Sequence, residues 1–254
     1  MLEEILKRLK NEYGEILKNN LVGIYIHGSI ALNCFNPEES DVDFIVVVND
    51  RLDNEVQNNL INILLEMKDI APKKGFEMSV VLRKYCLDFE YPTPYELHFS
   101  NDWENKYFNM PDSVCNQDFK IDPDLAAHFT IIRCCGQVLC GMPINEVFGE
   151  VKKEYYIDSI HRDIANAKEE ILNNPCYMIL NLCRVLAYLK DDKILSKEQG
   201  GLWGLENLNG EYKDTIQNAL DNYLNNVDII ENDKGKLEFA EDMLNEIGVY
   251  YISR

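Results

Sequence analysis

Hydrophobic residues in the first half of the chain switch between the spacing of helices and that of strands. Residues 2–20 place apolar side chains three or four positions apart, which predicts an amphipathic helix. Short apolar runs at 21–29, 41–50 and 76–84 predict buried strands, and residues 53–70 return to helical spacing. This alternation predicts an α/β arrangement in which both faces of a sheet are covered.

From about residue 120 the apolar pattern becomes helical. The segment DPDLAAHFTIIRCCGQVLCG predicts one helix that ends at Gly141, just before Pro143. After residue 90, the closing VYYIS is the one run with a strand-like composition. Further helices are predicted at 151–172, 176–190, 211–225 and 236–247.

The change from mixed to helical pattern predicts two domains. It falls within residues 92–120, a stretch with several prolines and Asn/Asp-rich turns. We expect an α+β domain with a mixed sheet and helices over residues 1–110. An all-α helical bundle is expected over residues 111–254. The chain length of 254 residues is ample for both cores.

Composition and charge narrow the classes of protein. A hydrophobic fraction of 46% excludes a disordered chain, and no apolar run is long enough to span a bilayer. The first residues, MLEEILKRLK, mix acids, bases and aliphatics, unlike a signal peptide. We therefore expect a cytoplasmic protein with no membrane partner. The eight cysteines form no CxxC pair, which favours reduced thiols over a zinc site.

The charge balance bears on partners. With 25 Lys+Arg against 44 Asp+Glu, the net charge is −19. Such a field repels a phosphate backbone, so a nucleic-acid partner is not expected. It attracts cations, either metal ions or a basic small molecule. Acidity that serves only solubility is the alternative explanation.

Two aspartates stand at the start of the second predicted strand. Asp41 and Asp43 point to the same face because side chains alternate along a strand, whereas Val42 points to the other face. Carboxylates this close repel each other, and a divalent cation removes that repulsion. Their oxygens suit Mg²⁺ or Mn²⁺. An Asp-x-Asp pair alone is a weak signal.

Neighbouring residues strengthen that signal. Gly28 lacks a Cβ, so a phosphate can approach its backbone, and Ser29 offers a hydroxyl and an N–H group. Glu77, on the third predicted strand, adds a carboxylate, although an exposed strand residue is the alternative. A phosphate-binding turn, two metal-binding aspartates and a third acid are what nucleotidyl transfer requires.

The chain resembles a known enzyme family at this point. The Gly-Ser turn followed by SDVDFIVVV looks like the signature of DNA polymerase β-type nucleotidyltransferases. The remaining motifs are similar to the aminoglycoside O-adenylyltransferases that modify spectinomycin and streptomycin. They are FEMSVV (76–81), YPTPYELHFSNDW (91–103), DPDLA (122–126) and ILNLCRVLAYLKDDKILSKEQGGLWGLENL (179–208).

The resemblance implies an N-terminal nucleotidyltransferase domain joined to a C-terminal helical domain. It implies ATP as co-substrate and Mg²⁺, with two ions, as cofactor. By position it assigns nucleotide contacts to Gly28, Ser29, Ser40 and Lys197, and metal binding to Asp41, Asp43 and Glu77. Glu77 would also act as general base. Substrate contacts would come from Trp103, Asp122 and Asp124.

Plainer explanations exist for several of these residues. Trp103 could be a core aromatic, Asp122 and Asp124 a helix cap with a first-turn acid, and Lys197 a solvated helix end. Leu186 stands where streptomycin-modifying members of the family have a tryptophan, which favours spectinomycin as substrate.

The leading hypothesis is Mg²⁺-dependent transfer of AMP from ATP to a hydroxyl of a cationic aminocyclitol or aminoglycoside antibiotic, giving resistance. The first alternative is a nucleotidyltransferase of the same fold that adenylylates a protein. A non-catalytic nucleotide-binding module is a further alternative, which the three retained carboxylates disfavour. Polymerase activity is disfavoured by the negative charge and the lack of any basic run.

Overall fold

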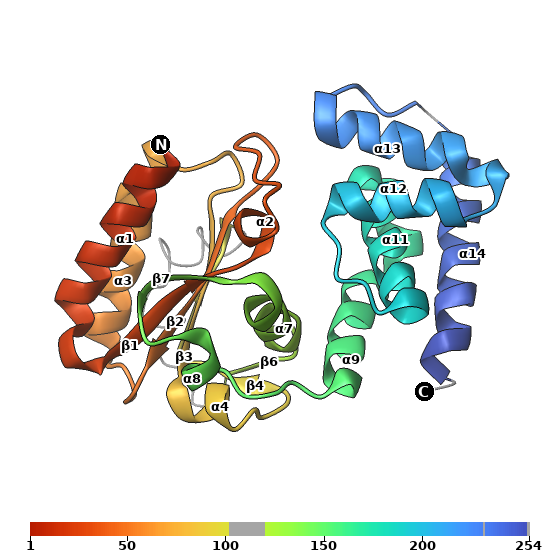
Figure 1. Cartoon of the computed structure of the whole chain (residues 1–254). Helices are drawn as coiled ribbons and strands as arrows, with labels where there is room; N and C mark the ends of the chain where they lie inside the picture. The colour runs from red at the N-terminus through yellow and green to blue at the C-terminus, as the bar shows by residue number, and fades with distance from the viewer. Residues whose placement is uncertain (102–119, 231, 253–254) are drawn as a thin grey trace. The chain divides into compact units, whose positions relative to one another are not determined.

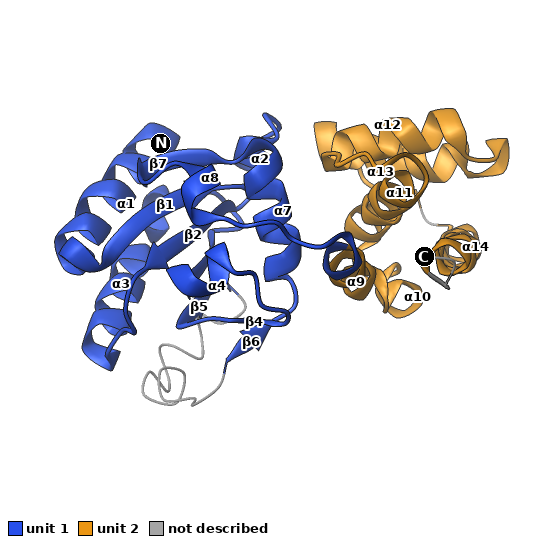
Figure 2. Cartoon of the chain, turned by 60° about the horizontal axis from the view of Figure 1, so that its bottom comes forward, with its two compact units in different colours: residues 1–156 blue, residues 157–254 orange. Residues whose placement is uncertain are grey.

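The computed structural model describes residues 1–101, 120–230 and 232–252. The chain forms two compact units, Met1–Tyr156 and Ile157–Arg254 (Figure 2). This division falls later than the boundary between residues 110 and 111 that the sequence predicts, because the first unit also contains the helix and strand that follow residue 120. Each unit has its own hydrophobic core.

A five-stranded mixed sheet forms the centre of the first unit. The strand order is β5-β3-β2-β1-β7. β2 and β3 run parallel, and the other neighbours are antiparallel. The strands are β1 (Leu21–Ile26), β2 (Val42–Val48), β3 (Phe76–Leu82), β5 (Leu97–Phe99) and β7 (Gln137–Gly141); β4 (Thr93–Pro94) and β6 (Ile121–Asp122) form a separate pair.

Helices cover both faces of this sheet (Figure 1). α1 (Leu2–Leu17) and α3 (Asn54–Glu66) pack on one face, where they bury Phe44 and Val46 of β2. α7 (Leu125–Cys135) packs on the other face against Ile45 and Val47. Every residue of β2 is buried, which is why its sequence is nearly all apolar. The mixed sheet with helices is confirmed.

Alternation along β2 and β3 also determines where polar side chains point. Asp43 shares its face with Ile45, and Glu77 shares its face with Val81. Both apolar residues pack in the core beneath α7. Asp43 and Glu77 therefore point to the α7 face, whereas Val42 joins the core on the opposite face.

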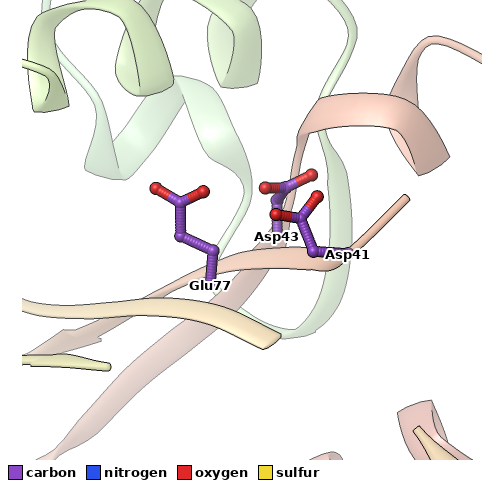
Figure 3. A group of neighbouring side chains, drawn as sticks. All are labelled: Asp41, Asp43 and Glu77. Atoms are coloured by element: carbon purple, nitrogen blue, oxygen red, sulfur yellow. The ribbon is translucent and has the colours of Figure 1, made fainter. Parts of the chain in front are cut away.

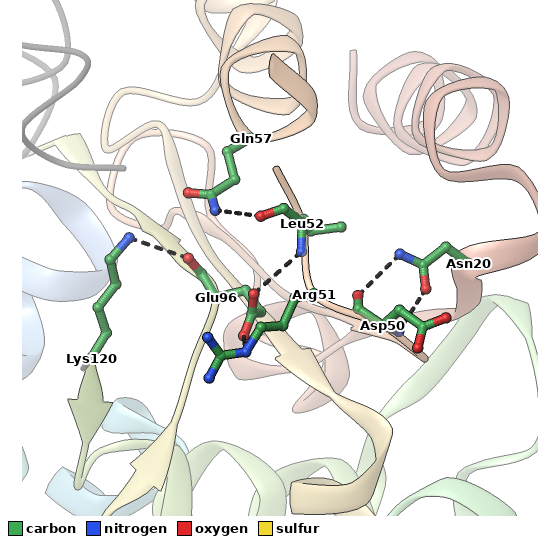
Figure 4. A network of polar contacts seen from close by, with 7 residues as sticks. All are labelled: Asn20, Asp50, Arg51, Leu52, Gln57, Glu96 and Lys120. Atoms are coloured by element: carbon green, nitrogen blue, oxygen red, sulfur yellow. Dashed lines mark hydrogen bonds and ion pairs between the residues drawn. The ribbon is translucent and has the colours of Figure 1, made fainter. Parts of the chain in front are cut away.

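A polar network fixes the chain at the other end of β2 (Figure 4). The Asn20 side-chain amide donates to the Asp50 carbonyl at 3.0 Å, and the Asp50 N–H donates back to Asn20 Oδ1 at 2.7 Å. The Leu52 N–H donates to Glu96 Oε2 at 3.3 Å, and Lys120 Nζ donates to the Glu96 carbonyl at 3.2 Å. The bonds of Asn20 and Glu96 join the segment that follows β2 to the residues just before β1 and β5.

The prediction of one helix up to Gly141 is wrong for the second half of that segment. α7 ends at Cys135, and β7 then pairs antiparallel with β1. Gly136 ends the helix in an extended conformation, and Val138 and Cys140 pair with Tyr25 and Ile24. The apolar run is short enough to suit either structure, so periodicity alone does not separate them.

The second unit is helical. α11 is its centre, and its side chains pack against those of α12, α13 and α14. Gly204 lets α12 approach α11 closely, since an added Cβ would lie 2.8 Å from Cys183 Sγ. Residues 249–252 of the closing VYYIS belong to α14, not to a strand. The helices are α9 (Lys153–Ile164), which begins in the first unit, α10 (Ala167–Glu170), α11 (Pro175–Asp191), α12 (Lys197–Asn207), α13 (Lys213–Asn225) and α14 (Asp233–Ile252).

Among the described residues, no helix combines the length and apolar character needed to cross a bilayer.

Candidate active site

Three carboxylates meet at one end of the paired strands β2 and β3 (Figure 3). Asp41 immediately precedes β2, Asp43 is the second residue of β2, and Glu77 is the second residue of β3. Asp43 and Glu77 are direct partners across the two parallel strands. One oxygen of each carboxylate lies within 4.8 Å of the others. An all-oxygen set with this much negative charge fits a divalent cation such as Mg²⁺.

The pKa of Glu77 is raised. Burial of the carboxyl is the main cause, and the negative charges of Asp41, Asp122 and Asp124 add to it. His128 acts in the opposite direction and lowers the pKa. A carboxylate with a raised pKa is a better proton acceptor than an ordinary one, which suits a general base.

Gly28 brings the turn after β1 against the acidic residues. Its φ of +58° is in the left-handed region, and a Cβ added there would overlap the Asp43 carboxylate. The His27 N–H donates to the Asp43 carbonyl at 3.1 Å, which joins the turn to β2. Only glycine fits both the backbone angle and the space. The turn and the carboxylates are therefore one site.

Two serines border the site. Ser29, in the short helix α2 (Gly28–Ala31), has a buried hydroxyl with no hydrogen-bond partner among the described residues. A buried hydroxyl without a partner is costly unless a ligand supplies one. The buried Ser40 hydroxyl accepts from the Asn36 N–H at 3.1 Å, which leaves its own hydrogen for another acceptor. Both placements suit phosphate oxygens.

The two aspartates of DPDLA lie on the same side of the first unit as Glu77. Asp122 Oδ1 accepts from the Asp124 N–H at 2.8 Å just before α7 begins. Asp124 occupies the N-cap position, but its side chain makes no capping hydrogen bond. Capping therefore does not explain Asp124. Both carboxylates are near enough to raise the pKa of Glu77. Trp103 lies outside the described residues.

Lys197 belongs to the second unit. It is the first residue of α12, and Ser196 before it forms a capping box with Gln199. The Lys197 ammonium lies 4.8 Å from the centre of the Tyr177 ring. A helix N-terminus with a lysine suits an anionic ligand. The capping box also makes this the true start of a helix that the sequence analysis did not predict.

His128, beside the triad of Asp41, Asp43 and Glu77, was not predicted from the sequence. His128 lies on α7, and its Nε2 is 3.6 Å from Glu77 Oε1. A single histidine within an amphipathic helix carries no motif, so nothing in the sequence alone pointed to it. Only the packing of α7 over β3 brings the two side chains together.

Two known protein families together match most of the chain. Residues 2–107 match the family described as nucleotidyltransferase domain. Residues 146–246 match the family described as aminoglycoside adenylyltransferase, C-terminal domain. The chain is thus similar in both of its parts to the aminoglycoside adenylyltransferases. It is accordingly a nucleotidyltransferase, as the sequence predicts.

Individual aminoglycoside adenylyltransferases are similar over almost the whole length. An aminoglycoside (3'') (9) adenylyltransferase of Klebsiella pneumoniae is 24% identical over 99% of this chain and 96% of its own. A spectinomycin 9-adenylyltransferase of Enterococcus faecalis is 23% identical over 87% of each chain. The crystal structure of an Enterococcus spectinomycin adenyltransferase, AAD(9), with ATP and spectinomycin superposes with a TM-score of 0.82. At 20% identity over 97% of this chain and 99% of the other, it confirms the fold.

Proposed function

We propose that this protein transfers AMP from ATP to a hydroxyl of an aminocyclitol or aminoglycoside antibiotic, with spectinomycin favoured over streptomycin, and so gives resistance. The observation that carries the proposal is the meeting of Asp41, Asp43 and Glu77 beside the Gly28–Ser29 turn. This places oxygen ligands for a cation next to backbone that accepts a phosphate.

The residues present fit a magnesium cofactor. Asp41, Asp43 and Glu77 would hold the metal, because each offers an oxygen within 4.8 Å of the others. Bound Mg²⁺, as one or two ions, would neutralise the triphosphate and polarise the α-phosphate. The hydroxyl of Ser29, which has no partner in the described part of the chain, and that of Ser40 would donate to phosphate oxygens. Lys197, by its charge at a helix start, would contact the nucleotide.

Glu77 would carry the proton transfer. Its carboxylate takes the proton of the antibiotic hydroxyl as that oxygen forms a bond to the α-phosphorus of ATP. The bond between the α-phosphorus and the bridging oxygen breaks, and pyrophosphate leaves with the electron pair. The products are the AMP ester of the antibiotic and pyrophosphate, and Glu77 then releases its proton to solvent. The raised pKa of Glu77 supports this role.

A cationic substrate suits the acidic surroundings. The net charge is −19, and Asp122 and Asp124 add negative charge near Glu77. We assign substrate contacts to these two aspartates and to Trp103. The preference for spectinomycin is supported by the similarity to spectinomycin 9-adenylyltransferases. It does not rest on Leu186, which is fully buried in the core of the second unit and so does not contact a substrate.

Pyrophosphate release tests the proposal. Purified protein is given Mg-ATP with spectinomycin, streptomycin or other aminoglycosides, and ATP without antibiotic serves as the control. We expect Mg²⁺-dependent release with spectinomycin and less with streptomycin. A protein that binds Mg-ATP but releases no pyrophosphate with any antibiotic would contradict the proposal and favour adenylylation of a protein acceptor.

A further inference from the structure

Two histidine rings are in contact beside the triad of Asp41, Asp43 and Glu77. His128 of α7 and His27 at the end of β1 have ring centres 4.6 Å apart and planes inclined by 37°. His27 is buried, and only 17% of the His128 side chain is exposed. His128 Nε2 lies 3.6 Å from Glu77 Oε1. All three residues belong to the first unit.

The hydrogen bonding of the two imidazole rings bears on their role. Within the described residues, His128 Nδ1 and His27 Nε2 are buried and have no hydrogen-bond partner. His128 faces Glu77 with its other ring nitrogen, Nε2. Leaving buried nitrogens without partners is unfavourable, so the fold alone gives little reason for two imidazoles here.

Like charges act on Glu77 from several described residues. Its side chain is 33% exposed. Asp41, Asp122 and Asp124 all act on it as like charges, which favours a conformation turned away from them. His128 has the opposite effect on Glu77, and its contact with Oε1 restrains the carboxylate.

We propose that His128 is a positioning residue, which holds the Glu77 carboxylate through Nε2 in the orientation needed for metal binding and proton acceptance, while the His27 ring packs against His128 and supports it. This inference rests on the proposed function in assigning those roles to Glu77. Groups that orient a metal ligand without touching the metal commonly change metal affinity or activity by about 10–100-fold.

Two amide variants separate positioning from packing. The amide nitrogen of His128→Gln reaches the place of Nε2, whereas that of His128→Asn reaches only the place of Nδ1. Both are polar and smaller than histidine, and thermal unfolding of each variant measures the loss of packing, which is larger for the shorter asparagine. A positioning role predicts that glutamine replaces histidine and asparagine does not. The thermal unfolding curve of each amide variant reports whether it is folded. If one is not, His128→Leu is measured in its place.

Metal affinity gives the first readout. Mn²⁺ alone is titrated into the full-length protein and followed by electron paramagnetic resonance. We expect Mn²⁺ binding about tenfold weaker in His128→Asn, and within about threefold of wild type in His128→Gln. Equal affinity in all three proteins, or equal losses in both variants, would overturn the inference.

Turnover gives the second readout. With spectinomycin and Mg-ATP, we expect kcat of His128→Asn to fall about 10–100-fold while KM changes little, and His128→Gln to recover most of kcat. A wild-type protein that binds Mn²⁺ but has no turnover with any antibiotic would contradict the proposed function. The Mn²⁺ comparison would still decide the role of His128.

Discussion

The backbone of Gly28 passes so close to the Asp43 carboxylate that no side chain fits between them. Gly28→Ala would force the Asp43 carboxylate to move and would place a Cβ on a backbone with φ of +58°. The backbone effect alone should lower the free energy of unfolding by about 1–2 kcal/mol. We expect Mn²⁺ binding and turnover to be lost as well.

Gly14→Ala is the matched control for this change. Gly14 lies in α1, and an added Cβ there would meet no atom within 4 Å. Alanine in a helix interior should raise the free energy of unfolding by about 0.5–1 kcal/mol. Chemical denaturation and Mn²⁺ titration of both variants measure these effects. Wild-type metal binding by Gly28→Ala would show that the close approach is not needed.

The acidic triad predicts that metal stabilises the fold. At about 100 times its dissociation constant, Mn²⁺ should add about 2.7 kcal/mol to the free energy of unfolding of the wild type. Asp43→Asn should lose this increment because a ligand is gone. Without metal, the variant should be at least as stable as the wild type, since one of three repelling charges is removed. Thermal unfolding with and without Mn²⁺ checks both statements. Equal stabilisation of the two proteins would place the metal elsewhere.

The core of the site could be predicted from sequence because alternation along strands fixes which face a side chain points to. That rule put Asp41 and Asp43 on one face and Val42 on the other, and it left Glu77 opposite its apolar neighbours. The alternation rule brings Glu77 to the two aspartates only if β2 and β3 are neighbours in the sheet. They are neighbours because the connection through α3 joins them as adjacent parallel strands.

Other features could not be predicted because they depend on packing between distant segments. The contact of His128 with Glu77 arises only when α7 covers the sheet. β7 was not predicted because Val138 and Cys140 belong to a short apolar run whose spacing is compatible with a helix or a strand. Only the pairing with β1 decides between the two. Leu186 was interpreted as a substrate position because a sequence match carries no information on burial.

Burial of His27 predicts an acid-sensitive fold. Burial, with a smaller effect of His128, holds the pKa of His27 well below its usual value near 6.5. Below pH about 6.5 the unfolded state therefore binds a proton that the folded state excludes, and the free energy of unfolding falls as the pH is lowered. The loss should approach about 1.4 kcal/mol per pH unit for this group.

His27→Phe removes that group while keeping an aromatic ring against His128. Urea denaturation at pH 7.5 and 5.5 should show a smaller pH dependence for the variant than for the wild type. Some dependence remains, because burial also lowers the pKa of His98 and His161. The same loss of stability in both proteins would mean that His27 does not titrate as described.

Formation of AMP-spectinomycin by wild type and by Glu77→Gln tests whether Glu77 is the general base of adenylyl transfer. The product is quantified by mass spectrometry after incubation with Mg-ATP and spectinomycin, and thermal unfolding confirms that the variant is folded. Loss of a general base typically costs about 10²–10⁴-fold in rate. We expect the wild type to add one AMP to spectinomycin and Glu77→Gln to lose nearly all of this activity. A folded Glu77→Gln that retains more than a few per cent of the wild-type rate would contradict the role of Glu77 as general base.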